Sequence, residues 1–168
     1  MRFLKSFRYA IRGIVYCINN ERNMRFHTVA AVYVLAFSPF FSLSREDYAI
    51  LFLTIAAVMT AEMFNTVAEE LCDLDAASFH PVVRIVKDMA AGAVLITAAF
   101  SVAVGIALFW KPAVLAEIVH YFFVRPPMIL LLLATIAASV LYIAVGPTSL
   151  RDFIRGKIAG LNGRTHGK

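Results

Sequence analysis

The chain has 168 residues, of which 61% are hydrophobic and only 16% are charged, with a formal net charge of +5. Soluble globular domains are about 45–50% apolar and about 25% charged, and disordered chains contain still fewer apolar residues. The composition excludes both classes and predicts an all-α, polytopic membrane helical bundle, because helices satisfy their backbone internally in lipid. We attribute the excess of Lys and Arg to cytoplasmic loops and expect no nucleic-acid partner.

The first 20 residues predict an amphipathic helix that lies on the membrane surface. Its apolar residues recur at steps of three and four: Phe3, Phe7, Ile11, Ile14, Val15 and Ile18. Its basic residues mostly occupy the opposite side: Arg2, Lys5, Arg8 and Arg12. This pattern fits a segment with a role in function and, equally well, an interfacial anchor that has no chemistry of its own.

Four long apolar runs follow, at residues 28–41, 48–68, 89–110 and 128–145. A helix needs about 20 residues to cross a hydrocarbon core of about 30 Å. The second, third and fourth runs meet this length. The first is short and contains Pro39, so we expect either that it extends backwards past His27 or that the bilayer thins around it. These runs predict three core transmembrane helices and a fourth near the C-terminus.

The distribution of basic residues predicts the orientation of these helices. With the N-terminus inside and four crossings, thirteen of the 16 Lys and Arg residues lie on the cytoplasmic side. The three on the outer side are Arg45, Lys111 and Arg125. By the positive-inside rule, both termini are cytoplasmic. Cys17 and Cys72 then lie on the reducing side, where we expect free thiols.

Oxygen-bearing side chains interrupt the end of the second run, in AEMFNTVAEELCDLD at residues 61–75. At 100° per residue, one stripe collects four of them, Glu62, Asn65, Glu69 and Asp73, whereas Glu70 and Asp75 point elsewhere. Ionisable groups at membrane depth are costly and usually functional. Carboxylates and an amide on one face suit Mg²⁺. The alternative is a solvated acidic helix end, which describes the residues from Glu69 onward better than it describes Glu62 and Asn65.

Two other charged clusters lie at the same cytoplasmic boundary. Glu21 precedes the first run and is followed by Arg25 and His27, and Lys87–Asp88 opens the third run. A lysine beside magnesium suits phosphoryl transfer from a nucleotide, although Lys87–Asp88 alone is an ordinary helix-end pair. The sequence contains no P-loop and no protein-kinase loop set. Its histidines are scattered, which gives a zinc site little support.

The sequence contains Glu62-Met-Phe-Asn65-Thr-Val-Ala-Glu69, then Asp73, and then Lys87-Asp88 with a helix rich in small residues. This motif resembles that of the prokaryotic diacylglycerol kinase family. The Glu21-x-x-x-Arg25 pattern also fits this family. The His-Pro pair at residues 80–81 and the Ala-Ala-Gly at residues 90–92 are similar to its Gram-positive branch, whose members include undecaprenol kinases. The likeness covers about residues 1–110.

The resemblance implies a homotrimeric membrane enzyme whose active sites lie at the cytoplasmic boundary between neighbouring subunits. It implies that Glu62 is the general base and that Asn65 helps to hold the site. It also implies that Glu21 and Glu69 bind the Mg²⁺ of MgATP. The implied nucleotide contacts are Lys87 and Asp88, with His80, Tyr9 and Arg2 as lesser ones.

The C-terminal third departs from the family pattern, which ends near Trp110. We therefore expect a lipid kinase domain at residues 1–110 and an extension at residues 111–168. In the extension, residues 114–124 are expected along the outer surface. A fourth transmembrane helix would then return the chain to the cytoplasm, where the basic tail either meets anionic lipid or only anchors the topology.

Two classes of function follow from the sequence. The first is an ATP-dependent lipid kinase of the bacterial inner (plasma) membrane, with a cytoplasmic active site and undecaprenol as the leading substrate, ahead of diacylglycerol. The second is a small cation transporter or channel whose stripe at residues 62–73 lines an ion path. The crowding of acidic residues at one membrane boundary favours the kinase. An inactive relative is disfavoured because the motif residues are all present.

Overall fold

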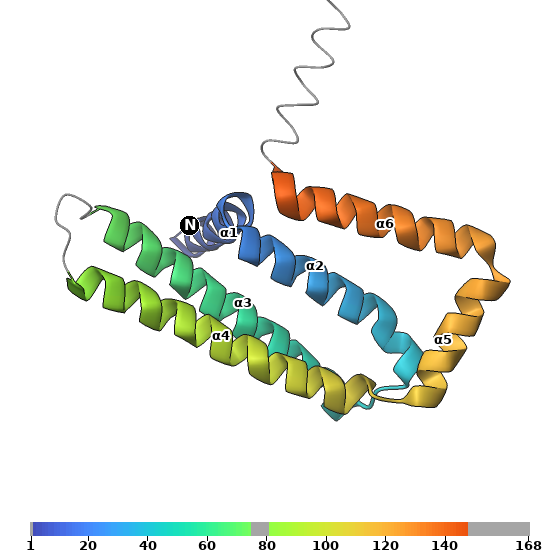
Figure 1. Ribbon diagram of the computed structural model, residues 1–168. Helices are drawn as coiled ribbons and strands as arrows, with labels where there is room; N and C mark the ends of the chain where they lie inside the picture. The colour runs from blue at the N-terminus through green and yellow to red at the C-terminus, as the bar shows by residue number, and fades with distance from the viewer. Residues whose placement is uncertain (1, 75–80, 148–168) are drawn as a thin grey trace, which may run out of the picture.

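The computed structural model describes residues 2–74 and 81–147, and in these residues it contains helices and no strand (Figure 1). Six α-helices and one short 3₁₀ turn follow in chain order: α1 (Arg2–Asn20), α2 (Arg22–Phe37), η1 (Ser38–Phe41), α3 (Arg45–Leu74), α4 (Pro81–Phe109), α5 (Pro112–Val124) and α6 (Pro126–Val145). Four segments are long and apolar enough to cross a membrane. The predicted all-α membrane bundle is therefore confirmed.

The first span begins earlier than its apolar run, as expected. It covers Arg22–Phe41, because α2 starts six residues before Thr28 and continues into η1. The α-helix ends at Phe37, two residues before Pro39, which has no backbone N–H to continue the ladder. Ser42 then adopts a left-handed conformation, with φ of 49°. The first span thus has 20 residues, enough to cross a bilayer without local thinning.

The helices α3 and α4 form an antiparallel pair that lies side by side in Figure 1. They have 30 and 29 residues, or about 45 Å each at 1.5 Å per residue. This length exceeds a hydrocarbon core of about 30 Å. Charged residues such as Glu69 and Lys87 occupy the last turns of α3 and the first turns of α4, so we infer that the excess length lies at the end of the bundle where α1 lies, which we call the α1 end.

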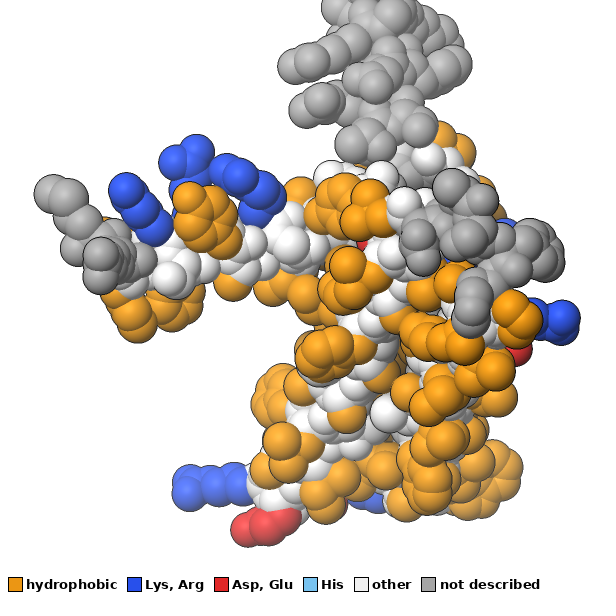
Figure 2. All heavy atoms as spheres, turned by 90° about the vertical axis from the view of Figure 1, so that its left-hand side faces the viewer, with side chains coloured by type: hydrophobic (Ala, Val, Ile, Leu, Met, Phe, Trp, Pro, Cys, Tyr) orange, Lys and Arg blue, Asp and Glu red, His pale blue; other side chains and the backbone are white. Residues whose placement is uncertain are grey.

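Helix α1 lies at this end (Figure 1) and projects from the bundle (Figure 2). In Figure 2 its Lys and Arg side chains stand mainly on one side of the projecting helix, with hydrophobic side chains on the opposite side. The predicted amphipathic helix is thus present. An amphipathic helix in this position presents its apolar side to lipid and its basic side to water and phosphate groups.

One stripe of α3 forms the interior of the bundle. Its buried residues are Leu51, Val58, Glu62, Asn65 and Thr66. Steps of seven, four and three residues place them on one helix face, and α2 and α1 pack against α3 there. Apolar residues fill this stripe in the membrane-spanning part. At the α1 end, polar residues replace them.

The C-terminal helices are attached to this bundle at both of its ends. Helix α5 joins the far ends of α4 and α6, and α6 runs back beside α2 (Figure 1). At the end of the bundle away from α1, the Lys111 ammonium donates a hydrogen bond to the Phe41 carbonyl oxygen at 2.8 Å.

A groove of about 670 Å³ lies between α2 and α6. The hydroxyl groups of Tyr33 and Ser139 form a hydrogen bond of 3.3 Å across it. No residue of α6 is buried.

The two cysteines are free thiols in different surroundings, and we expect them to react at different rates. Cys17 is only 4% exposed, and burial raises the pKa of its thiol, so less thiolate is present at a given pH. Cys72 is partly exposed. N-ethylmaleimide should modify Cys17 at least about tenfold more slowly than Cys72. The rates are measured on Cys17→Ser and Cys72→Ser proteins in micelles. Equal rates before denaturation would contradict the burial of Cys17.

Candidate active site at the α1 end

Glu62 is the one buried acidic side chain among the described residues. It is fully buried, with 0% exposure, on the inward stripe of α3. Asn23 of α2 approaches the carboxyl group, but neither carboxyl oxygen has a hydrogen-bond partner among the described residues. A buried carboxylate without a partner is costly. Such a group is suited to accept a proton from a hydroxyl group that enters the site.

Asn65 and Glu69 continue the stripe toward the α1 end. The Asn65 amide nitrogen donates to a Glu69 carboxylate oxygen at 2.8 Å. The amide oxygen of Asn65 is buried and has no partner among the described residues. Asn65 thus orients Glu69, and its amide oxygen is a buried, unpartnered acceptor on the same helix stripe as Glu62. The spacing of Glu62, Asn65 and Glu69 predicted this shared face correctly.

Glu21 joins this stripe from a different element. It is the single residue between α1 and α2, with extended backbone angles, and it is partly buried. Burial raises the pKa of its carboxyl group, and the negative charges of Glu69 and Glu70 raise it further, while the Arg25 charge opposes them. Glu21 thus lies close enough to Glu69 and Glu70 for their negative charges to repel, and a cation would relieve this repulsion.

The residues present fit a magnesium ion that arrives with a nucleotide. Within residues 2–74 and 81–147, no three His, Cys, Asp or Glu side chains form a ready metal cage. Mg²⁺ does not require such a cage, because it usually binds one or two carboxylates and completes its shell with water and substrate phosphate. Glu21 and Glu69 supply two carboxylates of this kind.

Lys87 and Asp88 have different surroundings, although they are adjacent in sequence. The Lys87 ammonium forms an ion pair with Asp73, the last residue of the predicted stripe, and so connects α4 to α3. The side chain of Asp88 is 74% exposed and lies 3.9 Å from Arg84, one turn earlier on α4. The structure brings Lys87 to the acidic stripe, whereas Asp88 points to solvent.

The remaining predicted contacts lie on α1 or outside the described residues. Tyr9 is exposed on α1, with the Arg12 guanidinium 5.6 Å from its ring centroid. His80 and the side chain of Arg2 lie outside the described residues.

Tyr16 also belongs to the surroundings of the site and is not among the predicted site residues. Its hydroxyl donates to a Glu70 carboxylate oxygen at 2.6 Å, which ties α1 to α3. The signal was present in the sequence, because Tyr16 follows Tyr9 by seven residues and so shares its helix face.

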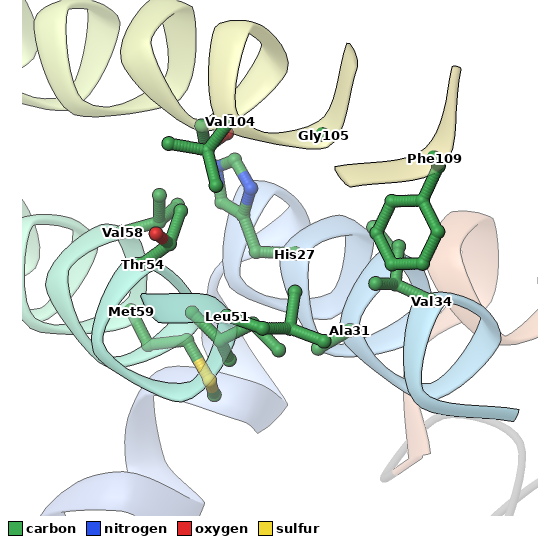
Figure 3. A pocket seen from close by; sticks show the side chains of 13 residues that line it. His27, Ala31, Val34, Leu51, Thr54, Val58, Met59, Val104, Gly105 and Phe109 are labelled. Carbon is green, nitrogen blue, oxygen red and sulfur yellow. The ribbon is translucent and has the colours of Figure 1, made fainter. Parts of the chain in front are cut away.

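A small cavity lies between α2, α3 and α4 (Figure 3). Its lining residues on α3 run from Leu51 to Met59, which places it farther from the α1 end than Glu62. Its volume is about 110 Å³, and most of its lining is apolar. The Thr54 and Ser101 hydroxyls donate to carbonyl oxygens of their own helices. His27 is the one ionisable side chain in the lining, and it points toward α4 (Figure 3). An ion that passed Glu62 would find few ligands here, which argues against a cation path.

Comparison with known proteins gives a family match. The family model of prokaryotic diacylglycerol kinase matches residues 8–109. The chain belongs to the prokaryotic diacylglycerol kinase family. Its enzyme class is therefore that of a lipid kinase, a phosphotransferase that works in a membrane.

Two relatives have different names within this class. Undecaprenol kinase of Bacillus subtilis (strain 168) is 40% identical over 108 residues, which are 64% of this chain and 88% of the relative. Diacylglycerol kinase of Synechocystis sp. (strain ATCC 27184 / PCC 6803 / Kazusa) is 41% identical over 110 residues, which are 65% of this chain and 63% of the relative. The chain therefore spans less than two thirds of the Synechocystis protein. The family match ends at Phe109, the last residue of α4, and leaves α5 and α6 outside it.

Proposed function

We propose that this lipid kinase transfers the γ-phosphoryl group of ATP to the hydroxyl of undecaprenol, giving undecaprenyl phosphate and ADP. The buried, unpartnered carboxylate of Glu62 is the observation that supports the reaction most directly. The B. subtilis undecaprenol kinase, most of whose length this chain covers, supports the substrate. Diacylglycerol, which would give phosphatidic acid, is the alternative substrate, because it presents the same hydroxyl chemistry at the interface.

In the proposed reaction, the lipid hydroxyl meets Glu62 at the α1 end of the bundle. Glu62 accepts the hydroxyl proton while the hydroxyl oxygen attacks the γ-phosphorus. The bond between the γ-phosphorus and the oxygen that bridges it to the β-phosphate breaks, and ADP leaves with that oxygen. Asn65 keeps Glu69 in place through its amide hydrogen bond. The proton then leaves Glu62 for solvent before the next turnover.

We assign the metal and nucleotide contacts from the family resemblance and from the positions of these residues at the α1 end. Glu21 and Glu69 would hold the Mg²⁺ of MgATP, which neutralises phosphate charge when bound. Lys87 would exchange its Asp73 partner for a phosphate oxygen, and Asp88 would contact the nucleotide from the first turns of α4. The lesser contacts that we retain from the family resemblance are Tyr9, Arg2 and His80.

We further propose a homotrimer in the bacterial plasma membrane, with both termini and the active site in the cytoplasm. Thirteen of the 16 basic residues lie on the predicted cytoplasmic side, which supports the orientation. Residues 1–110 would form the kinase unit and residues 111–168 an extension. The end of the family match at Phe109 supports this division.

A side-by-side assay tests the substrate. Purified protein in mixed micelles receives MgATP with labelled γ-phosphate and either undecaprenol or diacylglycerol. We expect kcat/KM for undecaprenol to exceed that for diacylglycerol by at least about tenfold, or about 1.4 kcal/mol of transition-state binding. The reverse preference would make diacylglycerol the substrate. Equal values would remove the basis for choosing undecaprenol.

A further inference from the structure

Arg25 is a buried cation that the proposed reaction does not use. Its exposure is 7%, and it belongs to the first turns of α2. Its Nη1 atom donates to the carbonyl oxygens of Ile18 at 3.3 Å and Asn19 at 3.0 Å, both in the last turn of α1. The last carbonyl groups of a helix lack partners within the helix and attract cations. The Arg25 side chain therefore fastens the end of α1 to the beginning of α2.

The junction that Arg25 fastens contains Glu21. Glu21 is the only residue between the two helices. Backbone hydrogen bonds continue across it, because its N–H donates to the Cys17 carbonyl and its carbonyl accepts from the Arg25 N–H. The direction of the Glu21 side chain therefore depends on the angle between α1 and α2. A side chain that bonds both helices sets this angle.

The third contact of Arg25 comes from the C-terminal extension. Its Nε atom donates to the Ile143 carbonyl oxygen in the last turn of α6 at 3.1 Å. Gly146 follows α6, is buried and has φ of +80°, a conformation that L side chains rarely adopt. A Cβ atom there would lie 3.2 Å from Arg25 Nη1 and 3.3 Å from its Cζ, a tight contact that would push the guanidinium aside. The end of α6 is thus fitted to the Arg25 side chain.

We propose that Arg25 is a positioning residue for Glu21, and that the end of α6, through Ile143 and Gly146, holds Arg25 in the position that this role requires. The C-terminal extension then contributes to MgATP binding although it lies outside the family match. The inference rests on the proposed function for the role of Glu21. The planar guanidinium is needed because it directs N–H groups to several carbonyl oxygens at once, whereas a lysine ammonium does not reproduce this fork.

The test compares Gly146→Ala and Arg25→Lys with the unchanged protein, all as full-length chains in micelles. Gly105→Ala is the matched control, because a Cβ at Gly105 meets nothing within 4 Å. For each protein we would measure kcat, KM for MgATP, binding of labelled MgATP by equilibrium dialysis, and the thermal unfolding midpoint. We expect KM and the dissociation constant to rise on the order of tenfold in both test variants, as for residues that orient metal ligands. We expect kcat to stay within about twofold, and Gly105→Ala to match the unchanged protein.

These readouts separate positioning from general support of the fold. If α6 only stabilised the protein, both variants would lower the active fraction, and hence kcat, with KM and the dissociation constant unchanged; that result would overturn the inference. If Gly146→Ala does not fold, the KM, dissociation constant and kcat of Arg25→Lys decide whether Arg25 positions Glu21. A protein that binds MgATP but phosphorylates no lipid would overturn the proposed function, and the dialysis measurement would still test the role of Arg25.

Discussion

Replacing Glu62 with glutamine should lower kcat for lipid phosphorylation by about 10²–10⁴-fold, the usual contribution of a general base. Glutamine has nearly the same shape but accepts no proton from a hydroxyl group. The dissociation constant for MgATP should stay within about twofold, because Glu62 is not among the proposed metal or nucleotide contacts. Rates are measured with labelled γ-phosphate, and binding by equilibrium dialysis.

Glu62→Gln should also leave the protein at least as stable as the original chain. Glu62 is fully buried, and its oxygens have no hydrogen-bond partner in the described part of the chain. A neutral amide there removes a buried charge, so the thermal unfolding midpoint should be unchanged or higher. Glu117→Gln, at an exposed position on α5, is the matched control and should retain full turnover. Undiminished phosphorylation by Glu62→Gln would exclude Glu62 as the base.

The second large effect is expected at Glu69. Glu69→Gln keeps a polar side chain beside Asn65 but removes one of the two carboxylates proposed to hold Mg²⁺. The Mg²⁺ concentration for half-maximal turnover should rise on the order of tenfold or more, with a smaller change in the rate at saturating Mg²⁺. It is measured by Mg²⁺ titration of lipid phosphorylation at a fixed ATP concentration.

Glu70→Gln is the control for this titration. Glu70 follows Glu69 directly, but its side chain is exposed and accepts a hydrogen bond from Tyr16. We expect its Mg²⁺ titration to shift by less than about twofold. An equal shift in both variants would indicate a general effect of negative charge, and an unchanged titration in Glu69→Gln would exclude Glu69 as a metal ligand.

The sequence predicted the helices and one face of the site because both depend on local periodicity. The length of each apolar run indicated a span, and the angular positions of Glu62, Asn65 and Glu69 indicated a shared stripe. Pro39 explained the end of α2, and the expected extension of the first span past His27 is present. These features follow from residues within a few turns of one another.

The remaining features of the site depend on contacts between helices, which local periodicity does not contain. No glycine or proline marks the break between α1 and α2 at Glu21, but the amphipathic pattern of the first 20 residues indicated it. The approach of Glu21 to the acidic stripe was expected only from the shared membrane boundary and the family resemblance, because local periodicity does not contain contacts between helices. Lys87 and Asp88 are adjacent in sequence, yet one meets Asp73 and the other meets Arg84. Arg25 is one of the predicted cytoplasmic charges, yet it is buried, and its guanidinium donates a hydrogen bond to Ile143 of α6.

The central claim is that this protein phosphorylates a membrane lipid. The most direct test mixes the purified protein with MgATP labelled in the γ-phosphate and a total lipid extract of a bacterial membrane, and then counts label in the organic phase. We predict that label moves into a lipid in the presence of the protein and of Glu117→Gln, and not in the presence of Glu62→Gln. Label that stays in ATP or appears only as inorganic phosphate, with folded protein that binds MgATP, would contradict the claim.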